Sequence, residues 1–383
     1  MRILIVMDSF KGNISGLEAS ESVAEGVKHA CPWADIRILP IADGGEGTVE
    51  VFVSSLRGSY RSGTVRGPLG EPLEARWGLL PDRGAVIELA AASGLPLVPF
   101  GRRNPLHTTT FGTGQQLRAA LDADAKYIVI GLGGSATNDG GMGILAALGV
   151  RFLDFEGREL DPVGKSLREV CRIDLSGLDP RVKDREIMLA CDVRNRLCGP
   201  QGAAAVFGPQ KGAGPAAIRE LDEGLANFAR CIAQAMGRDV TQLEGGGAAG
   251  GTAAGLAGIL GARVTRGIDV MAKVTGLDRE IRKADLIFTG EGRIDSQTSQ
   301  GKVISGLAER ARAARVPLVA LVGCVRGHMG PLMSMGLTAV FPITSGPCST
   351  AQSFQRSRED LSRTASQVVR LMRGTLRHHR ISG

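Results

Sequence analysis

The sequence RILIVMDSFKG at residues 2–12 joins an apolar run to a polar loop that contains glycine. Ser15 and Glu18 follow in the Ser-x-x-Glu spacing of a capping box, which marks the start of a helix ahead of the amphipathic segment 21–30. A buried strand, a loop and a helix in this order form the repeating unit of parallel α/β sheets. In such sheets ligands bind beyond the carboxyl ends of the strands.

The same pattern returns near the other end of the chain. DLIFTG at residues 285–290 is a second buried strand, and it leads through a polar loop into a helix that we expect over residues 302–315. The two ends of the sequence therefore predict one Rossmann-like parallel-sheet domain, formed by residues 1–60 and 280–383.

Residues 61–279 differ in character and predict a second, inserted domain. Short alternating segments are separated by the turns GPLGEP and PDRG, and we expect them to be antiparallel strands; they span residues 62–66, 75–80 and 85–89. Helical and buried-strand patterns follow along the chain. The middle of the sequence thus predicts a mixed α/β domain, and the interruption of the first domain predicts an active-site cleft between the two.

Composition excludes several other classes of protein. Of the 383 residues, 54 are glycine, well above the ordinary share of ~7%. Aromatic residues are only 4%, which argues against a base-stacking surface. Seven arginines at 356–380 account for most of the net charge of +7, and we interpret them as the solvated face of a terminal helix rather than a nucleic-acid or membrane site.

The cysteines and the first residues indicate the compartment. The seven cysteines include no C-x-x-C pair, which favours reduced thiols in the cytoplasm over a disulfide framework or zinc site. The apolar run at residues 1–7 is stopped by Asp8, too early for the core of a signal peptide.

Six polar loops carry the candidate chemistry. They are rich in glycine, carboxylates, hydroxyls and lysine, and they read DSFKG (8–12), ADGGEGT (42–48), GLGGSATNDGG (131–141), CDVRN (191–195), FGPQKGA (207–213) and TGEGRIDSQTSQGK (289–302). Backbone N–H groups near glycine cradle phosphates, and carboxylates bind divalent metal. Transfer of a phosphoryl group needs both. Only nine of the 46 basic residues are lysine, yet Lys11, Lys211 and Lys302 each stand beside a glycine in these loops.

Familiar nucleotide-binding motifs are missing from the sequence. No G-x-x-x-x-G-K-[ST] loop occurs, and GLGGSA departs from the G-x-G-x-x-G spacing at Ala136. Each loop also has a purely structural alternative: Ser135, Asn138 and Asp139 could cap a helix, and Asp192 could take part in a structural salt bridge.

Taken together and in this order, the loops resemble the glycerate kinase family, of the bacterial type whose chain starts with a strand and DSFKG. FGTG at 111–114 and GPQGAAAVFGPQKGA at 199–213 add to the match, which covers nearly the full length. One departure follows Asp192 and Asn195, where Arg196 replaces the usual proline. The resemblance implies ATP-dependent phosphorylation of D-glycerate to 2-phosphoglycerate with Mg²⁺ in the cytoplasm, by a monomer or a homodimer.

Roles for individual residues follow from the chemistry of phosphoryl transfer. We expect Asp192 to accept or orient the proton of the substrate hydroxyl, with Lys11 and Asp295 as further catalytic groups. Metal-side carboxylates are Glu291, Asp295 and Asp43. The substrate- or phosphate-binding set consists of Asp8, Ser9, Lys11, Gly133, Gly134, Ser135, Asn138, Asp139, Arg194, Lys211, Arg293 and Lys302.

Other functions remain open at the level of sequence. The same kinase chemistry could give 3-phosphoglycerate. A nicotinamide-dependent hydroxy-acid oxidoreductase would use similar glycine loops, although its fingerprint is missing. A ligand sensor that uses the basic tail for nucleic acid would show salt-dependent DNA binding, and the sequence has no helix-turn-helix pattern to support it.

Overall fold

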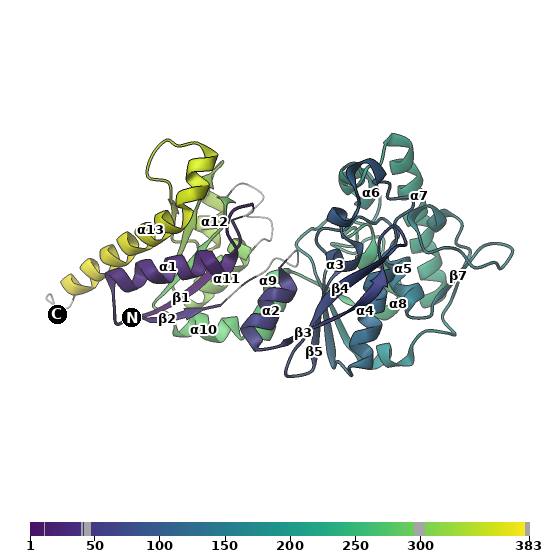
Figure 1. Cartoon of the computed structure of the whole chain (residues 1–383), viewed down its shortest axis with the longest axis horizontal. Helices are drawn as coiled ribbons and strands as arrows, with labels where there is room; N and C mark the ends of the chain where they lie inside the picture. The colour runs from purple at the N-terminus through teal and green to yellow at the C-terminus, as the bar shows by residue number, and fades with distance from the viewer. Residues whose placement is uncertain (11, 40, 42–46, 295–302, 380–383) are drawn as a thin grey trace. The chain divides into compact units, whose positions relative to one another are not determined.

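The computed structural model describes residues 1–10, 12–39, 41, 47–294 and 303–379, with backbone alone at 375–379 (Figure 1). The chain forms two compact units. Unit 1 comprises residues 1–43 and 271–383, and unit 2 comprises residues 44–270. The sequence predicts bounds at 60/61 and 279/280, whereas the units divide at 43/44 and 270/271. The first division lies earlier because residues 48–56 pack on strands of unit 2.

Unit 1 is built on a five-stranded sheet in which all neighbours are parallel. Its strands, in spatial order, are β15 (Ala339–Pro342), β13 (Leu318–Val322), β11 (Leu286–Gly290), β1 (Arg2–Met7) and β2 (Asp35–Ile38). The order brings the two predicted apolar runs together, since β1 pairs with β11 along its length. The parallel-sheet domain expected from the two ends of the sequence is confirmed.

Helices cover this sheet. They are α1 (Gly16–Ala30), α10 (Leu277–Lys283), α11 (Val303–Ala314), α12 (Gly330–Met335) and α13 (Thr350–His379). The capping box of α1 is present, with Ser15 and Glu18 bonded to each other's backbone N–H. α1 and α13 lie side by side on the face of β1 that bears Ile3, Ile5 and Met7 (Figure 1). A short parallel pair, β12 (Arg293–Ile294) and β14 (Cys324–Val325), completes the unit.

Unit 2 has a six-stranded mixed sheet. Its strands, in spatial order, are β10 (Arg263–Thr265), β9 (Glu186–Ala190), β6 (Tyr127–Gly131), β5 (Gly84–Glu88), β4 (Pro72–Leu79) and β3 (Ser59–Arg66). β3, β4 and β5 pair antiparallel, as expected, but β5 also pairs parallel with β6. The expectation for residues 85–89 is therefore correct on one side of the strand and wrong on the other.

The helices of unit 2 are α2 (Thr48–Leu56), α3 (Leu89–Ser93), α4 (Phe111–Asp122), α5 (Met142–Ala147), α6 (Ala203–Phe207), α7 (Pro215–Met236) and α8 (Thr252–Leu260). Five 3₁₀ turns lie at 95–97, 100–102, 164–168, 180–184 and 209–211, and β7 (Arg151–Leu153) pairs with β8 (Arg172–Asp174). One hydrophobic core joins the sheet to α4, α5, α7 and α8. α9 (Gly267–Thr275) crosses the boundary between the units.

α2 shows why the boundary lies before residue 48. The helix packs on β4 and β5, and the backbone N–H of Val49 donates to the carboxylate of Glu88 on β5 at 2.7 Å. Over the residues that the structure describes, no helix combines the length and apolar character needed to cross a bilayer.

Candidate active site

In unit 2, neighbouring parallel strands carry two of the predicted loops. β5, β6 and β9 lie side by side, with Glu88 opposite Gly131 and Gly131 opposite Ala190. The loop at 131–141 leaves the end of β6, and the loop that begins at Cys191 leaves the end of β9. Both loops therefore start at adjacent positions on the carboxyl edge of the sheet, where parallel α/β sheets bind ligands.

The tip of the 131–141 loop is its accessible part. Gly133 is half-buried and Gly134 is exposed, with a φ of +72° that favours glycine. The backbone around the tip is fixed, because the N–H of Leu95 donates to the carbonyl of Gly134 at 2.8 Å and that of Ala136 donates to Ser93 at 2.9 Å. The tip presents backbone to solvent in a set conformation, which is what an anion cradle requires.

Asp139 anchors the rest of this loop and is fully buried. Its Oδ2 accepts hydrogen bonds from the N–H of Thr110 at 2.8 Å, from the hydroxyl of Thr110 at 2.7 Å and from the N–H of Gly143 at 3.2 Å. Its Oδ1 accepts from the N–H of Gly141 at 3.1 Å. Burial raises the pKa of this carboxyl, although the four donors act in the opposite direction. The contacts make Asp139 the link between the loop and the starts of α4 and α5.

Lys211 lies inside the same network and is only 2% exposed. Its Nζ donates to the hydroxyl of Ser135 at 2.8 Å and to the carbonyl of Thr137 at 2.7 Å. Burial lowers the pKa of Lys211 to about 7, and the charge of Asp139 opposes that shift. The predicted phosphate-binding lysine thus has its donors directed at the 131–141 loop itself.

Two polar groups of the loop have no hydrogen-bond partner among the residues that the structure describes. Asn138 is fully buried, and neither its Oδ1 nor its Nδ2 is bonded; the hydroxyl of Thr137 is in the same state. Buried amides and hydroxyls are nearly always hydrogen-bonded in native proteins. The interior of this loop therefore holds an amide and a hydroxyl whose hydrogen-bonding capacity the described residues leave unused.

Asp192 and Arg194 follow β9. Asp192 is half-buried, and its Oδ1 accepts the backbone N–H of Gly267 at 2.8 Å. The Arg194 side chain is 63% exposed, and its Nε lies 3.4 Å from a carboxylate oxygen of Glu244. An exposed ion pair of this kind contributes little to stability. Arg194 can consequently exchange it for another anion.

Unit 1 brings a second group of predicted residues together. Asp8 follows β1, and Glu291 follows the adjacent strand β11. The last residues of these two strands, Met7 and Gly290, are paired in the sheet. The N–H of Asp8 donates to the carbonyl of Gly290 at 2.9 Å. The N–H of Ser9 donates to the carboxylate of Asp8 at 2.7 Å. Arg293 is exposed on β12. Asp8 and Glu291 thus share the carboxyl edge of the sheet of unit 1.

Four predicted residues, Lys11, Asp43, Asp295 and Lys302, lie outside the described residues. Two of the three predicted metal-side carboxylates are among them, which leaves Glu291 as the third. Within the described ranges, no three His, Cys, Asp or Glu side chains cluster as metal ligands do.

The sequence-based prediction did not include three threonines that support the site. Thr108 donates its hydroxyl to the carbonyl of Ala136 at 3.0 Å, Thr110 holds Asp139, and Thr137 belongs to the loop itself. The run TTT at 108–110 was the available signal, because hydroxyl residues just before a helix often bond to nearby polar groups. Their carboxylate and carbonyl partners lie about 30 residues away and could not be assigned.

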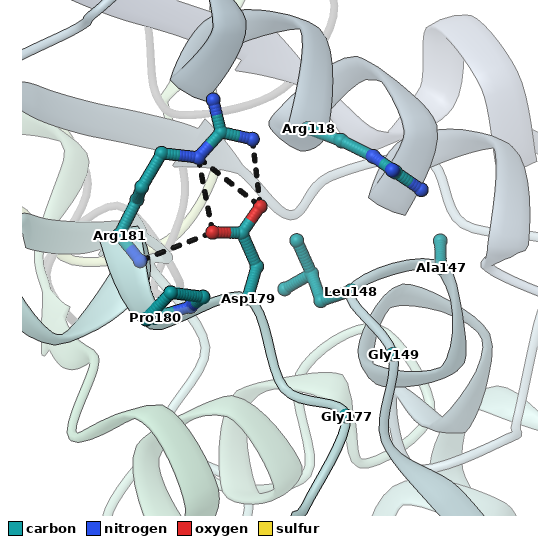
Figure 2. A pocket seen from close by; sticks show the side chains of 8 residues that line it. All are labelled: Arg118, Ala147, Leu148, Gly149, Gly177, Asp179, Pro180 and Arg181. Carbon is teal, nitrogen blue, oxygen red and sulfur yellow. Dashed lines mark hydrogen bonds and ion pairs between the residues drawn. The ribbon is translucent and has the colours of Figure 1, made fainter.

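A cavity of about 330 Å³ lies elsewhere in unit 2 (Figure 2). Its lining residues come from α4, from the end of α5 and the two residues after it, and from residues 177–181, which lead into the 180–184 turn: Arg118, Ala147, Leu148, Gly149, Gly177, Asp179, Pro180 and Arg181. Asp179 and Arg181 bind each other there, as the dashed lines in Figure 2 show, with Arg181 Nη2 2.7 Å from Asp179 Oδ2. None of the predicted site residues lines this cavity.

Glycine loops and buried polar groups at the carboxyl edges of α/β sheets are typical of enzymes that act on small anionic ligands. A model of the glycerate kinase family matches residues 3–373. Two similar proteins bear related names. The glycerate kinase of Bacillus subtilis (strain 168) is 46% identical over 370 residues, covering 96% of this chain and 97% of that protein. The glycerate 2-kinase of Escherichia coli (strain K12) is 42% identical over 370 residues, with the same two shares.

A solved structure agrees with these relatives. The crystal structure of a protein from Salmonella typhimurium LT2, provisionally described as glycerate kinase 2, superimposes with a TM-score of 0.89 at 44% identity and covers 98% of this chain and 99% of that one. The chain belongs to the glycerate kinase family, so the resemblance seen in its loops is confirmed. It is a kinase, and the family implies ATP as the phosphate donor.

Proposed function

We propose that this kinase phosphorylates D-glycerate and forms 2-phosphoglycerate. The family match over residues 3–373 carries the proposal. The finer assignment to the 2-hydroxyl is supported by the name of the E. coli relative, which is 42% identical. The alternative is the same chemistry at the 3-hydroxyl. An oxidoreductase is not proposed, because the chain belongs to a kinase family and lacks the dinucleotide fingerprint.

Two groups of residues in unit 2 support the binding of a small hydroxy acid. The tip at Gly133 and Gly134 offers backbone to an anion, and Arg194 offers an exposed guanidinium to a carboxylate. Asp192 would orient the reacting hydroxyl as a hydrogen-bond acceptor. In unit 1, Ser9 and Arg293 are the corresponding candidates for phosphate contacts.

We also propose Mg²⁺ as the cofactor. Kinases hold this ion through one or two carboxylates together with the nucleotide phosphates, and the bound ion neutralises charge on the transferring phosphoryl group. Glu291 and Asp8, at the ends of adjacent strands, are the described carboxylates in a position to hold it. Asp43 and Asp295 remain predictions outside the described residues.

The proposed location is the cytoplasm. All seven cysteines are free thiols in the structure, which fits a reducing compartment. The enzyme is proposed to act as a monomer or a homodimer.

The test is a coupled assay of ADP release with D-glycerate, L-glycerate or no acceptor, with and without Mg²⁺. We expect ADP release only when both D-glycerate and Mg²⁺ are present. Phosphorus NMR of the product should show 2-phosphoglycerate. A product resonance of 3-phosphoglycerate would refute the choice of oxygen. Absence of ADP release with either acid would refute the proposed substrate.

A further inference from the structure

Lys211 and Ser135 form a buried amine–hydroxyl pair. The 2.8 Å between Lys211 Nζ and Ser135 Oγ is a good hydrogen-bond distance, and a second bond to the carbonyl of Thr137 fixes the amine. Ser135 directly follows the accessible tip at Gly133 and Gly134. The hydroxyl of this pair is therefore the end nearer to the position where the loop meets solvent.

The backbone holds Lys211 in place from its other side. Gly212 has a φ of +92°, and a Cβ there would lie 2.2 Å from the carbonyl oxygen of Arg103. The backbone of Gly212, which directly follows Lys211, thus lies in close contact with the backbone of Arg103. A lysine held in this way is poorly suited to bind a phosphate in solvent, but it is suited to exchange a proton with the hydroxyl beside it.

The charges around Lys211 are few. Its neighbours in the loop are a hydroxyl and a carbonyl, and among the described residues the charged group that acts on it is Asp139. Arg103, whose backbone contacts Gly212, has its guanidinium over the Phe100 ring, 5.4 Å from the ring centre. Burial outweighs the carboxylate, and the pKa of Lys211 falls to about 7. A general base works best when its pKa is close to the working pH.

We propose that Ser135 and Lys211 act as the proton-accepting pair for the hydroxyl that attacks ATP. The inference rests on the proposed function and deepens it. Asp192 orients the substrate hydroxyl, whereas the Ser135–Lys211 pair in the same unit accepts its proton. Paired serine and lysine side chains perform related proton transfers in other enzymes.

The step balances as follows. The substrate O–H bond breaks as its oxygen forms a bond to the γ-phosphorus of ATP. The proton goes to Ser135 Oγ, and the proton that Ser135 carried goes to the neutral Nζ of Lys211, which becomes an ammonium. The bond from the γ-phosphorus to the bridging oxygen breaks, and its electron pair leaves with ADP. Lys211 returns its proton to solvent before the next turnover.

The experiment is a pH profile of kcat from pH 5.5 to 9 on the full-length enzyme, with saturating ATP and D-glycerate. The wild type should lose turnover tenfold per pH unit below about pH 7, because protonated Lys211 cannot accept a proton. Ser135→Ala should lower kcat about 100-fold and abolish that acid limb. Ser135→Thr restores the hydroxyl and should recover most of the rate together with the limb.

Lys211→Arg and Asp192→Asn complete the set. Lys211→Arg keeps a cation that stays protonated, so kcat should fall about 100-fold and vary little with pH. Asp192→Asn should lower turnover but keep the acid limb near pH 7. Circular dichroism of each variant checks the fold, and Ser135→Ala tests the pair even if Lys211→Arg fails to fold.

Two results would overturn the inference while the proposed function stands: an acid limb that persists in Ser135→Ala, or one that disappears only in Asp192→Asn. A wild-type enzyme without turnover on D-glycerate would instead refute the proposed function, and the proton-accepting pair with it.

Discussion

Replacing Lys211 by methionine should change how the stability of unit 2 depends on pH. The unfolded chain protonates this amine with a pKa near the ordinary 10.5, whereas burial holds the folded pKa at about 7. Between these values the unfolded state binds one more proton than the folded state. Raising the pH therefore favours folding by about 1.4 kcal/mol per pH unit. Stability is therefore highest above pH 10.5, falls progressively as the pH drops from 10.5 to about 7, and changes little from this group below that.

The size of the effect is large for one side chain. Over the whole interval it amounts to about 5 kcal/mol, and from pH 7 to 9 to about 2 kcal/mol, because Lys211 is half-protonated at the lower end. Lys211→Met also leaves Ser135 and Thr137 without their donor, which lowers stability by about 1–3 kcal/mol at every pH. Only the dependence on pH reports the buried titration.

Tryptophan fluorescence can follow unit 2 alone. The chain has two tryptophans: Trp77 is 5% exposed on β4 in unit 2, and Trp33 is 67% exposed in unit 1. Urea unfolding would be measured at pH 7, 8 and 9 in a Trp33→Phe background, with and without Lys211→Met. The stability difference between the two proteins should shift by about 2 kcal/mol over this range. If the stability difference between the two proteins is the same at pH 7, 8 and 9, Lys211 titrates at its ordinary pKa. The reasoning about burial would then be wrong.

Two further substitutions test contacts within the units. Thr110→Val removes one donor to the buried carboxylate of Asp139 and should lower the stability of unit 2 in urea unfolding by about 2–3 kcal/mol. Thr110→Ser keeps the hydroxyl and should lower it by less than half as much. Equal losses in the two variants would contradict the role of the hydroxyl. Gly26→Ala places a Cβ 1.9 Å from the carbonyl oxygen of Ser362, so it should separate α1 from α13 and lower the melting temperature of unit 1 by several degrees. Gly374→Ala, where a Cβ meets no atom within 4 Å, is the matched control and should leave the melting temperature unchanged or slightly higher.

Local patterns were sufficient to predict most of the fold. The apolar runs of β1 and β11 and the capping box of α1 each depend on residues close together in sequence, and all three occur in the structure. β5 was only half predicted. All but the last of its residues are buried, and β6 lies along its second edge. The alternating pattern of residues 85–89 does not show that the strand after α4 pairs with them.

The candidate site shows the same limit. The sequence indicated that Lys211 is chemically important, because lysine is rare in this chain and glycine flanks it. It could not show the burial of the amine, which depends on the 131–141 loop and on the segment around Arg103, both distant in sequence. For the same reason Thr110 was missed: its function is defined by Asp139, 29 residues further on.

The position of β1 inside the sheet of unit 1 affects how the protein can be synthesised. β1 is synthesised long before one of its two partners: β2 follows it closely and pairs with one edge, but β11, its partner on the other edge, ends only at Gly290. At a synthesis rate of about 5–20 residues per second, this edge of β1 stays unpaired for on the order of tens of seconds, while the contiguous unit 2 can already fold. During this interval an apolar strand with an open edge is exposed to other nascent chains. Until β11 is synthesised, chaperones that bind exposed apolar strands would therefore have β1 as a substrate.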